Sequence, residues 1–172
     1  MRRWSMYLLP FMTACMSGVN PLVLATGTTA DISTGVDDVD LPGTPQTHEA
    51  FAILLNVERS SAGVGGVVEL VEDSRLSQAA QGHALDMLAN GYLSHTDLEG
   101  GSVGDRALAV GYDWNFIAEN IAQGFNSNAS VIQAWMNSPL HRDNMLDERA
   151  EDFGLGRVNG TWVLMLGREF SE

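Results

Sequence analysis

The dipeptide Asn159-Gly160, between two apolar segments, restricts the fold of this chain more than any other feature. A type I′ turn needs a positive φ at both central residues, and Asn-Gly accepts that conformation most readily. The flanking segments Phe153–Val158 and Thr161–Arg168 therefore predict an antiparallel β-hairpin. We therefore expect the fold to contain at least one antiparallel strand pair.

Helical periodicity is clearest from Leu76 to Leu88, where apolar residues recur three and four positions apart. Asp73 or Ser74 can cap the start of this helix, and Gly91 suits the left-handed position after its end. Three further helices are expected, over residues 47–59, 103–110 and 129–137.

Residues 116–122 are mostly apolar and predict a buried strand. Four helices and about three strands indicate an α+β fold, an α-β-α sandwich with a small antiparallel sheet between helices. The chain has 172 residues, of which 45% are hydrophobic, and this suits one folded domain with a real core.

The N-terminal region predicts export. Two arginines precede a short apolar run in residues 1–25, which indicates an export signal cleaved after Ala25. Alternatively, residues 1–14 are a lipoprotein signal, and Cys15 becomes the lipid-bearing N-terminus. Residues 26–46 then form an acidic flexible linker, and residues 47–172 form the folded domain. Both alternatives place the protein outside the cytoplasm, secreted, periplasmic or attached to the cell surface.

The charge is strongly negative. Acidic residues outnumber basic ones 22 to 9, and every basic residue is an arginine. Such a chain is poorly suited to bind nucleic acid, which needs cations against the phosphates. The N-terminal apolar run is too short and interrupted to predict a transmembrane helix, so none is expected in the exported form.

Glu119 is the one charged residue within the predicted strand 116–122. A carboxylate there is costly unless it is paired, bound to a metal or turned outward. It could face a cleft together with His95 and His141, which lie near element ends. Two imidazoles and a carboxylate suit zinc or another divalent cation, and equally a general acid–base group. Alternatively, Glu119 points to solvent and Asn120 turns inward.

Other polar or aromatic residues have structural explanations. His83 lies on the apolar stripe of its helix and is expected to be packed in the core. Trp135 and Trp162 are expected to anchor the core. Ser138 lies three residues before a histidine, but no nucleophile elbow surrounds it, and it is expected to cap the turn at Pro139.

Six segments, taken in order, resemble the CAP superfamily (SCP/PR-1-like; cysteine-rich secretory protein, antigen 5 and pathogenesis-related 1), in its cysteine-poor bacterial branch. The likeness extends over most of the domain. The segments are Leu55–Arg59, Asp86-Met87, Ser94–Thr96, Glu119–Ala122, Trp135–Arg142 and Phe153–Gly156.

The resemblance implies an extracellular α-β-α sandwich with a cleft of two histidines and two acids. The histidines would be His95 and His141, and the first acid Glu119. The second acid would stand at position 138, where this chain has Ser138. Asp97 or Asp105 could compensate. Without that acid, a divalent ion held by the remaining three residues should bind weakly.

Several functions follow as hypotheses. The first is a non-enzymatic extracellular binding module for a small-molecule, lipid or cell-envelope ligand. The alternative is a metal-assisted hydrolase, peptidase-like, in which Glu119 acts as base while His95 and His141 hold an ion or polarise water. A third is a structural protein of the cell surface.

Overall fold

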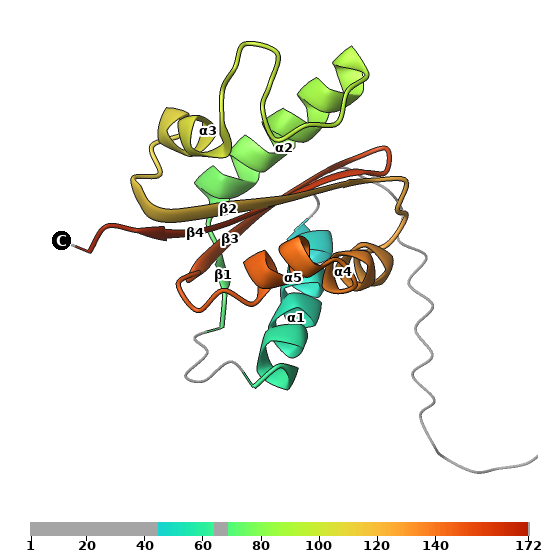
Figure 1. Cartoon of the computed structure of the whole chain (residues 1–172), viewed down its shortest axis with the longest axis vertical. Coiled ribbons are helices and arrows are strands. Elements are labelled where there is room, and N and C mark those ends of the chain that lie inside the picture. The colour runs from blue at the N-terminus through green and yellow to red at the C-terminus, as the bar shows by residue number, and fades with distance from the viewer. Residues whose placement is uncertain (1–44, 64–68, 172) are drawn as a thin grey trace, which may run out of the picture. The chain divides into compact units, whose positions relative to one another are not determined.

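The computed structural model describes residues 45–63 and 69–171, and the side chains from His48 onward. The predicted export signal, Cys15 and nearly all of the predicted linker lie outside these residues. The described part contains five helices and four strands (Figure 1). In chain order they are α1 (Pro45–Ser61), β1 (Val71–Glu72), α2 (Ser74–Asn90), α3 (Val103–Ala109), β2 (Trp114–Gln123), α4 (Asn128–Met136), α5 (Pro139–Met145), β3 (Asp152–Val158) and β4 (Thr161–Glu169).

The four strands form one sheet in the order β1-β3-β4-β2. The predicted hairpin is confirmed: β3 and β4 are antiparallel, and Asn159 and Gly160 have φ values of 45° and 74°. β2 pairs with β4 antiparallel and forms one edge. The other edge strand, β1, runs parallel to β3, so the sheet is mixed and not purely antiparallel. β1 escaped prediction because its two residues, both exposed, show no alternation.

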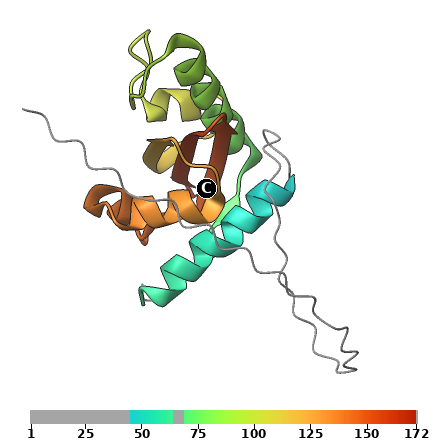
Figure 2. The same cartoon turned by 90° about the vertical axis from the view of Figure 1, so that its right-hand side faces the viewer.

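Helices cover both faces of the sheet, which confirms the predicted sandwich. α2 and α3 lie on one side, and α1, α4 and α5 lie on the other (Figure 2). Successive side chains of a strand point to opposite faces, so β4 contributes to two cores. Trp162 and Leu164 pack with α1 and α4, whereas Val163 and Met165 pack with α2. Trp135 and Trp162 are buried, as expected.

The helix ends follow the expected chemistry. The Asp73 side chain accepts hydrogen bonds from the backbone of Arg75 and Leu76, and Gly91 ends α2 with a φ of 68°.

The sequence does not predict helix α5. Pro139 does end the preceding helical segment, but it also occupies the first turn of α5, where its fixed φ suits a new helix. Ser138 stands at the N-cap of α5, although its side chain makes no capping hydrogen bond.

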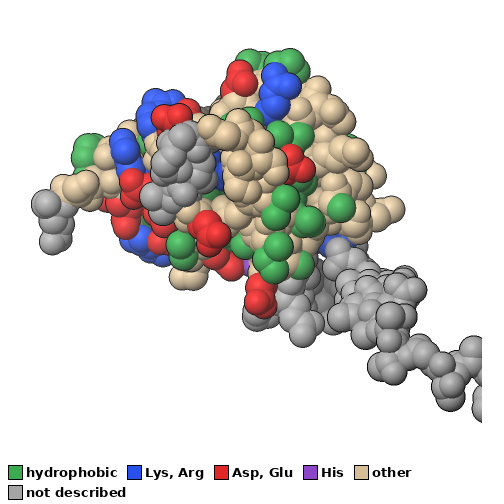
Figure 3. Space-filling model, turned by 90° about the horizontal axis from the view of Figure 1, so that it is seen from below, with side chains coloured by type: hydrophobic (Ala, Val, Ile, Leu, Met, Phe, Trp, Pro, Cys, Tyr) green, Lys and Arg blue, Asp and Glu red, His purple; other side chains and the backbone are tan. Residues whose placement is uncertain are grey.

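The surface uses arginines in local ion pairs. Arg75 lies 2.6 Å from a carboxylate oxygen of Asp73 and 2.8 Å from one of Glu169. On the face seen in Figure 3, arginine side chains lie next to acidic ones, with apolar side chains exposed between them. Within the described part of the chain, none of the helices combines the length and the apolar character that a membrane span requires.

Candidate functional site

Glu119 and Asn120 are neighbours on β2 and point to opposite faces of the sheet. Both are buried: Glu119 is 5% exposed and Asn120 is 0% exposed. Neither turns to solvent, so the alternative in which Glu119 faces water does not describe this structure. Glu119 meets residues on the α3 side, and Asn120 meets α5. Because β2 is an edge strand, segments from the two helical layers can meet beside it.

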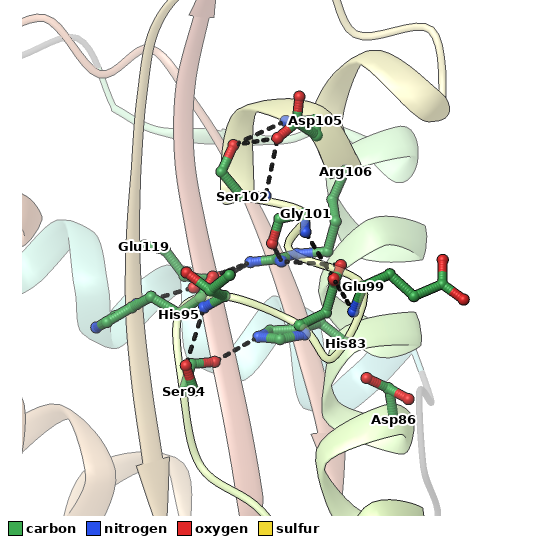
Figure 4. Close-up of polar contacts among 12 residues, drawn as sticks. His83, Asp86, Ser94, His95, Glu99, Gly101, Ser102, Asp105, Arg106 and Glu119 are labelled. Carbon is green, nitrogen blue, oxygen red and sulfur yellow. Dashed lines mark hydrogen bonds and ion pairs between the residues drawn. The ribbon is translucent and has the colours of Figure 1, made fainter.

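Both oxygens of the Glu119 carboxylate accept hydrogen bonds. His95 donates from Nδ1 to Oε1 over 2.9 Å, and Arg106 donates from Nη2 to Oε2 over 2.8 Å (Figure 4). The Glu119 side chain is only 1% exposed. A buried carboxylate is tolerated when its charge is paired and its lone pairs accept hydrogen bonds. The sequence suggests His95 as a neighbour of Glu119, but it does not suggest Arg106.

Arg106 also shapes the segment that carries His95. Its Nη2 donates to the backbone oxygen of His95 over 3.0 Å, and its Nη1 donates to that of Gly101 over 3.0 Å. Nη1 also lies 3.7 Å from the Asp97 carboxylate. One guanidinium therefore fixes the backbone of His95 as well as the carboxylate that holds its ring.

The hydrogen bond to Glu119 sets the tautomer of His95. A carboxylate accepts, so Nδ1 carries the proton, and in the neutral ring Nε2 keeps a free lone pair. The His95 side chain is 55% exposed. An imidazole oriented by a buried carboxylate, with its other nitrogen available, can bind a cation or a hydrogen-bond donor.

His141 approaches the site from α5. Its backbone oxygen accepts a hydrogen bond of 2.9 Å from Asn120 Nδ2, and Asn144 Nδ2 donates to Asn120 Oδ1 over 2.9 Å. These two bonds fasten α5 to β2. The pKa of His141 is lowered from its ordinary value, first by burial and then by the positive charge of nearby His95. The two imidazoles are therefore electrostatic neighbours.

The pKa of His141 gives a direct test of that neighbourhood. In NMR titration of the imidazole resonances, His141 should lose its proton at lower pH than an unperturbed histidine. The His95→Gln variant should raise this pKa part of the way, since burial remains. Because the pKa is lower in the folded protein, this histidine favours folding above its unfolded pKa, and that contribution is lost as the pH falls through its folded pKa. An identical pKa in both proteins would contradict the proximity.

The chain matches the profile of the CAP family, described as the Cysteine-rich secretory protein family, over residues 53–164. It belongs to this family. An uncharacterised Bacillus subtilis protein, YkwD, is 34% identical to this chain over 118 residues. The aligned residues cover 68% of this chain and 45% of YkwD. A second relative is the uncharacterised B. subtilis membrane protein YlbC, 32% identical over 91 residues, which cover 53% of this chain and 26% of that protein. The chain thus spans less than half the length of either relative.

Solved CAP-type structures share the fold. An extracellular protein of Bacillus anthracis that contains an SCP domain superposes with a TM-score of 0.66 at 28% identity, over 75% of this chain and 45% of that one. An outer surface protein of Borrelia burgdorferi has a TM-score of 0.67 at 21% identity, over 74% of this chain and 96% of that one. The latter likeness concerns the fold alone.

The residues considered as replacements for the second acid of the CAP site have other partners. Asp105 forms a capping box with Ser102 at the start of α3. Asp97 accepts hydrogen bonds from the backbone of Glu99 and Gly101. Within the described residues, neither aspartate, nor Ser138, is hydrogen-bonded to His95 or His141.

The resemblance to the CAP family also suggests a weakly held divalent ion at His95, His141 and Glu119. Among the described residues, no three His, Cys, Asp or Glu side chains are arranged to share a metal ion. The Glu119 carboxylate is committed to His95 and Arg106. The described residues therefore do not suit a zinc centre with three protein ligands.

His83 takes the structural role that the sequence predicts. It is 2% exposed on the core face of α2. Its Nε2 lies 2.8 Å from the backbone oxygen of Ser94, which fastens α2 to the segment leading to His95.

Proposed function

We propose that this CAP domain is an exported ligand-binding module that contacts its ligand through His95 and His141 and does not turn it over. The observation that carries the proposal is the commitment of both Glu119 oxygens to His95 and Arg106. The Glu119 carboxylate already accepts hydrogen bonds from two residues of the protein and is ion-paired. The two imidazoles are therefore the groups that would contact a ligand.

The same contacts disfavour the hydrolase alternative. A general base must reach the proton that it removes, but Glu119 is nearly inaccessible and ion-paired with Arg106. A nucleophilic mechanism needs a nucleophile in hydrogen-bond reach of a base, and Ser138 has no such bond to either histidine in the described residues.

In the proposed binding site each residue has a distinct role. Glu119 and Arg106 hold the His95 ring with Nε2 outward, and Asn120 fixes the α5 backbone at His141. A divalent ion, when bound, would be held by the two imidazoles and would offer a positive anchor for oxygen atoms of a small-molecule, lipid or cell-envelope ligand.

The location outside the cytoplasm is part of the proposal. The predicted export signal supports it, as does the likeness to the B. anthracis protein described as extracellular. Cleavage after Ala25 and a lipid on Cys15 remain alternatives, and mass spectrometry of the native N-terminus separates them.

Zinc titration tests the binding role. We expect calorimetry on the exported chain to give one weak site, lost in His95→Gln and in His141→Gln. Glu119→Gln should weaken it by about 10- to 100-fold, as loss of an outer partner does. His48→Gln serves as the matched control, because His48 pairs with Glu72 and makes no hydrogen bond to the His95 site within the described residues.

Two results would overturn the proposal. One is zinc binding that is unchanged in both His95→Gln and His141→Gln. The other is turnover of a peptide or cell-wall substrate by the wild-type protein that disappears in these same variants, since this would assign the site to catalysis.

A further inference from the structure

The chain contains two Asn-Gly dipeptides that are alike in sequence and in exposure. Asn159-Gly160 forms the turn between β3 and β4, and Asn90-Gly91 stands at the C-terminal end of α2. Both asparagines are exposed, and both glycines have a positive φ, 74° at Gly160 and 68° at Gly91. The two dipeptides differ in the hydrogen bonds that hold them, and this difference predicts a difference in chemical stability.

An asparagine followed by glycine is open to an intramolecular reaction. The backbone nitrogen of the glycine, once it has lost its proton, attacks Cγ of the asparagine side chain. A five-membered succinimide ring closes, and the side-chain nitrogen leaves as ammonia. Glycine favours this reaction because it has no Cβ to obstruct the approach and accepts either sign of φ. In a folded protein the reaction therefore depends on whether the two atoms can meet.

The turn type determines whether they meet at Asn159. Ring closure requires the Gly160 nitrogen to lie next to Cβ of Asn159, at a ψ of about −120°, which is the value of the first central residue in a type II′ turn. The positive φ at both residues identifies the turn as type I′, in which that ψ is about +30°. The two turn types differ mainly by a rotation of the peptide plane between their central residues. A flip of this one plane brings the reacting atoms together.

Among the described residues, no hydrogen bond opposes this flip. The Gly160 N–H donates none there, and neither the backbone oxygen nor the side chain of Asn159 takes part in one. The Gly160 oxygen accepts from the Gly124 nitrogen over 2.8 Å, but this oxygen belongs to the next peptide plane. The pairing of Val158 with Thr161, which closes the hairpin, can also stay in place. Gly160 is buried, but its reaction partner is the side chain of the adjacent residue.

At Asn90-Gly91 the same rotation would break hydrogen bonds. The Gly91 N–H donates to the backbone oxygen of Met87 at the end of α2. Nδ2 of Asn90 donates to the backbone oxygen of Asp86 over 3.1 Å and to its carboxylate over 2.7 Å. The attacking nitrogen and the side chain that it would attack are therefore both held. Asn90 is a matched internal control, an exposed Asn-Gly asparagine that the fold protects.

We propose that Asn159 is a site of spontaneous covalent modification in the folded protein, through a succinimide formed with Gly160. Water then opens the ring at either of its two carbonyl carbons. Attack at Cγ breaks the bond from Cγ to the Gly160 nitrogen and gives aspartate. Attack at the backbone carbonyl carbon breaks its bond to that nitrogen and gives isoaspartate, in which the chain runs through Cβ and Cγ. Overall, one water is consumed and one ammonia is released, with no oxidation or reduction.

The two products affect the hairpin differently. Asp-Gly accepts a type I′ turn as Asn-Gly does, so the aspartate product only adds a negative charge. Isoaspartate adds one carbon atom to the backbone of the turn, which strains the pairing of Val158 with Thr161. Because β3 and β4 are the two central strands of the sheet, we expect isoaspartate to lower the stability of the whole domain.

Peptide mapping by mass spectrometry of the exported chain tests the proposal, with electron-transfer fragmentation to distinguish isoaspartate from aspartate. The folded protein is incubated at mildly alkaline pH, which deprotonates more of the backbone amide, and a second sample is incubated in urea. In urea both asparagines should react at similar rates, because the fold no longer holds either dipeptide. In the folded protein Asn159 should give both products, and Asn90 should react at least about tenfold more slowly, because several hydrogen bonds must break first.

Two variants separate the reaction from its consequence. Asn159→Gln keeps a side-chain amide but would need a six-membered ring, so modification at this position should be lost while Asn90 behaves as in wild type. Asn159→Asp supplies the aspartate product directly and should unfold at the same urea concentration as fresh wild-type protein. Aged wild-type protein enriched in isoaspartate should unfold at a lower urea concentration than either.

Three results would overturn the proposal. The first is an Asn159 that reacts in urea but stays intact in the folded protein. The second is an equal rate at Asn159 and Asn90 in the folded protein. The third is aspartate without isoaspartate, since this would indicate direct hydrolysis of the side-chain amide. None of these outcomes depends on ligand binding at His95 and His141, so the two proposals can fail separately.

Discussion

Replacing Gly156 with alanine should lower the free energy of unfolding by about 3 kcal/mol or more, at the upper end of the usual cost of overpacking. α2 lies directly on β3 at this point. A Cβ atom on Gly156 would stand 2.3 Å from the backbone carbon of Ala80. Backbone cannot rotate away as a side chain can, so helix and strand would have to separate. Urea unfolding followed by circular dichroism measures the loss.

Gly154 provides a replicate and Gly82 a control. A Cβ atom on Gly154 would lie 2.2 Å from the backbone carbon of Leu76, so Gly154→Ala should be similarly destabilising. Gly82→Ala places the same methyl group in open space within a helix and should stabilise by about 0.5–1 kcal/mol. Similar unfolding midpoints for Gly156→Ala and Gly82→Ala would contradict the explanation that close contact between α2 and β3 requires glycine in this strand.

The parts of the fold that could be predicted are those whose signal is local. Asn159-Gly160 determines a turn by its own backbone preference, and Asp73 and Gly91 mark the ends of α2 by caps that need only adjacent residues. β1 carries no such signal, and the one local signal of α5, Pro139 in its first turn, equally marks the end of the preceding helix. β1 is held by its parallel pairing with β3, and α5 by side-chain bonds from Asn120 and Asn144. Both depend on contacts between residues distant in the sequence.

The candidate site shows the same division. Resemblance to the CAP family supplied the neighbourhood of His95, Glu119 and His141, whereas spacing alone had left open whether Glu119 faces water. Arg106 was not predicted because Glu119 was interpreted as a metal ligand or an acid–base group and not as an ion-paired carboxylate. A buried carboxylate within an apolar strand requires either a bound metal ion or a neighbouring cationic side chain. The single base of the predicted helix 103–110 was therefore the available signal.

Replacing Arg106 with methionine should cost about 3–5 kcal/mol, because it leaves a buried carboxylate without its cation. Glu119 would keep only the hydrogen bond from His95. The loop would also lose the bonds that Arg106 donates to the backbone of His95 and Gly101. Against a typical total stability of about 5–15 kcal/mol, this loss is large. Urea unfolding at neutral pH measures it.

Two further variants separate charge from packing. Adding Glu119→Gln to Arg106→Met should recover part of the loss, because a neutral amide needs no cation; the lost backbone bonds keep the recovery incomplete. Arg75→Met also separates an arginine from two carboxylates, but at a half-exposed position, and should cost no more than about 1 kcal/mol. If Arg106→Met cost no more than Arg75→Met, the buried ion pair would not be what holds His95 in place, and the binding role proposed for that histidine would lose its structural basis.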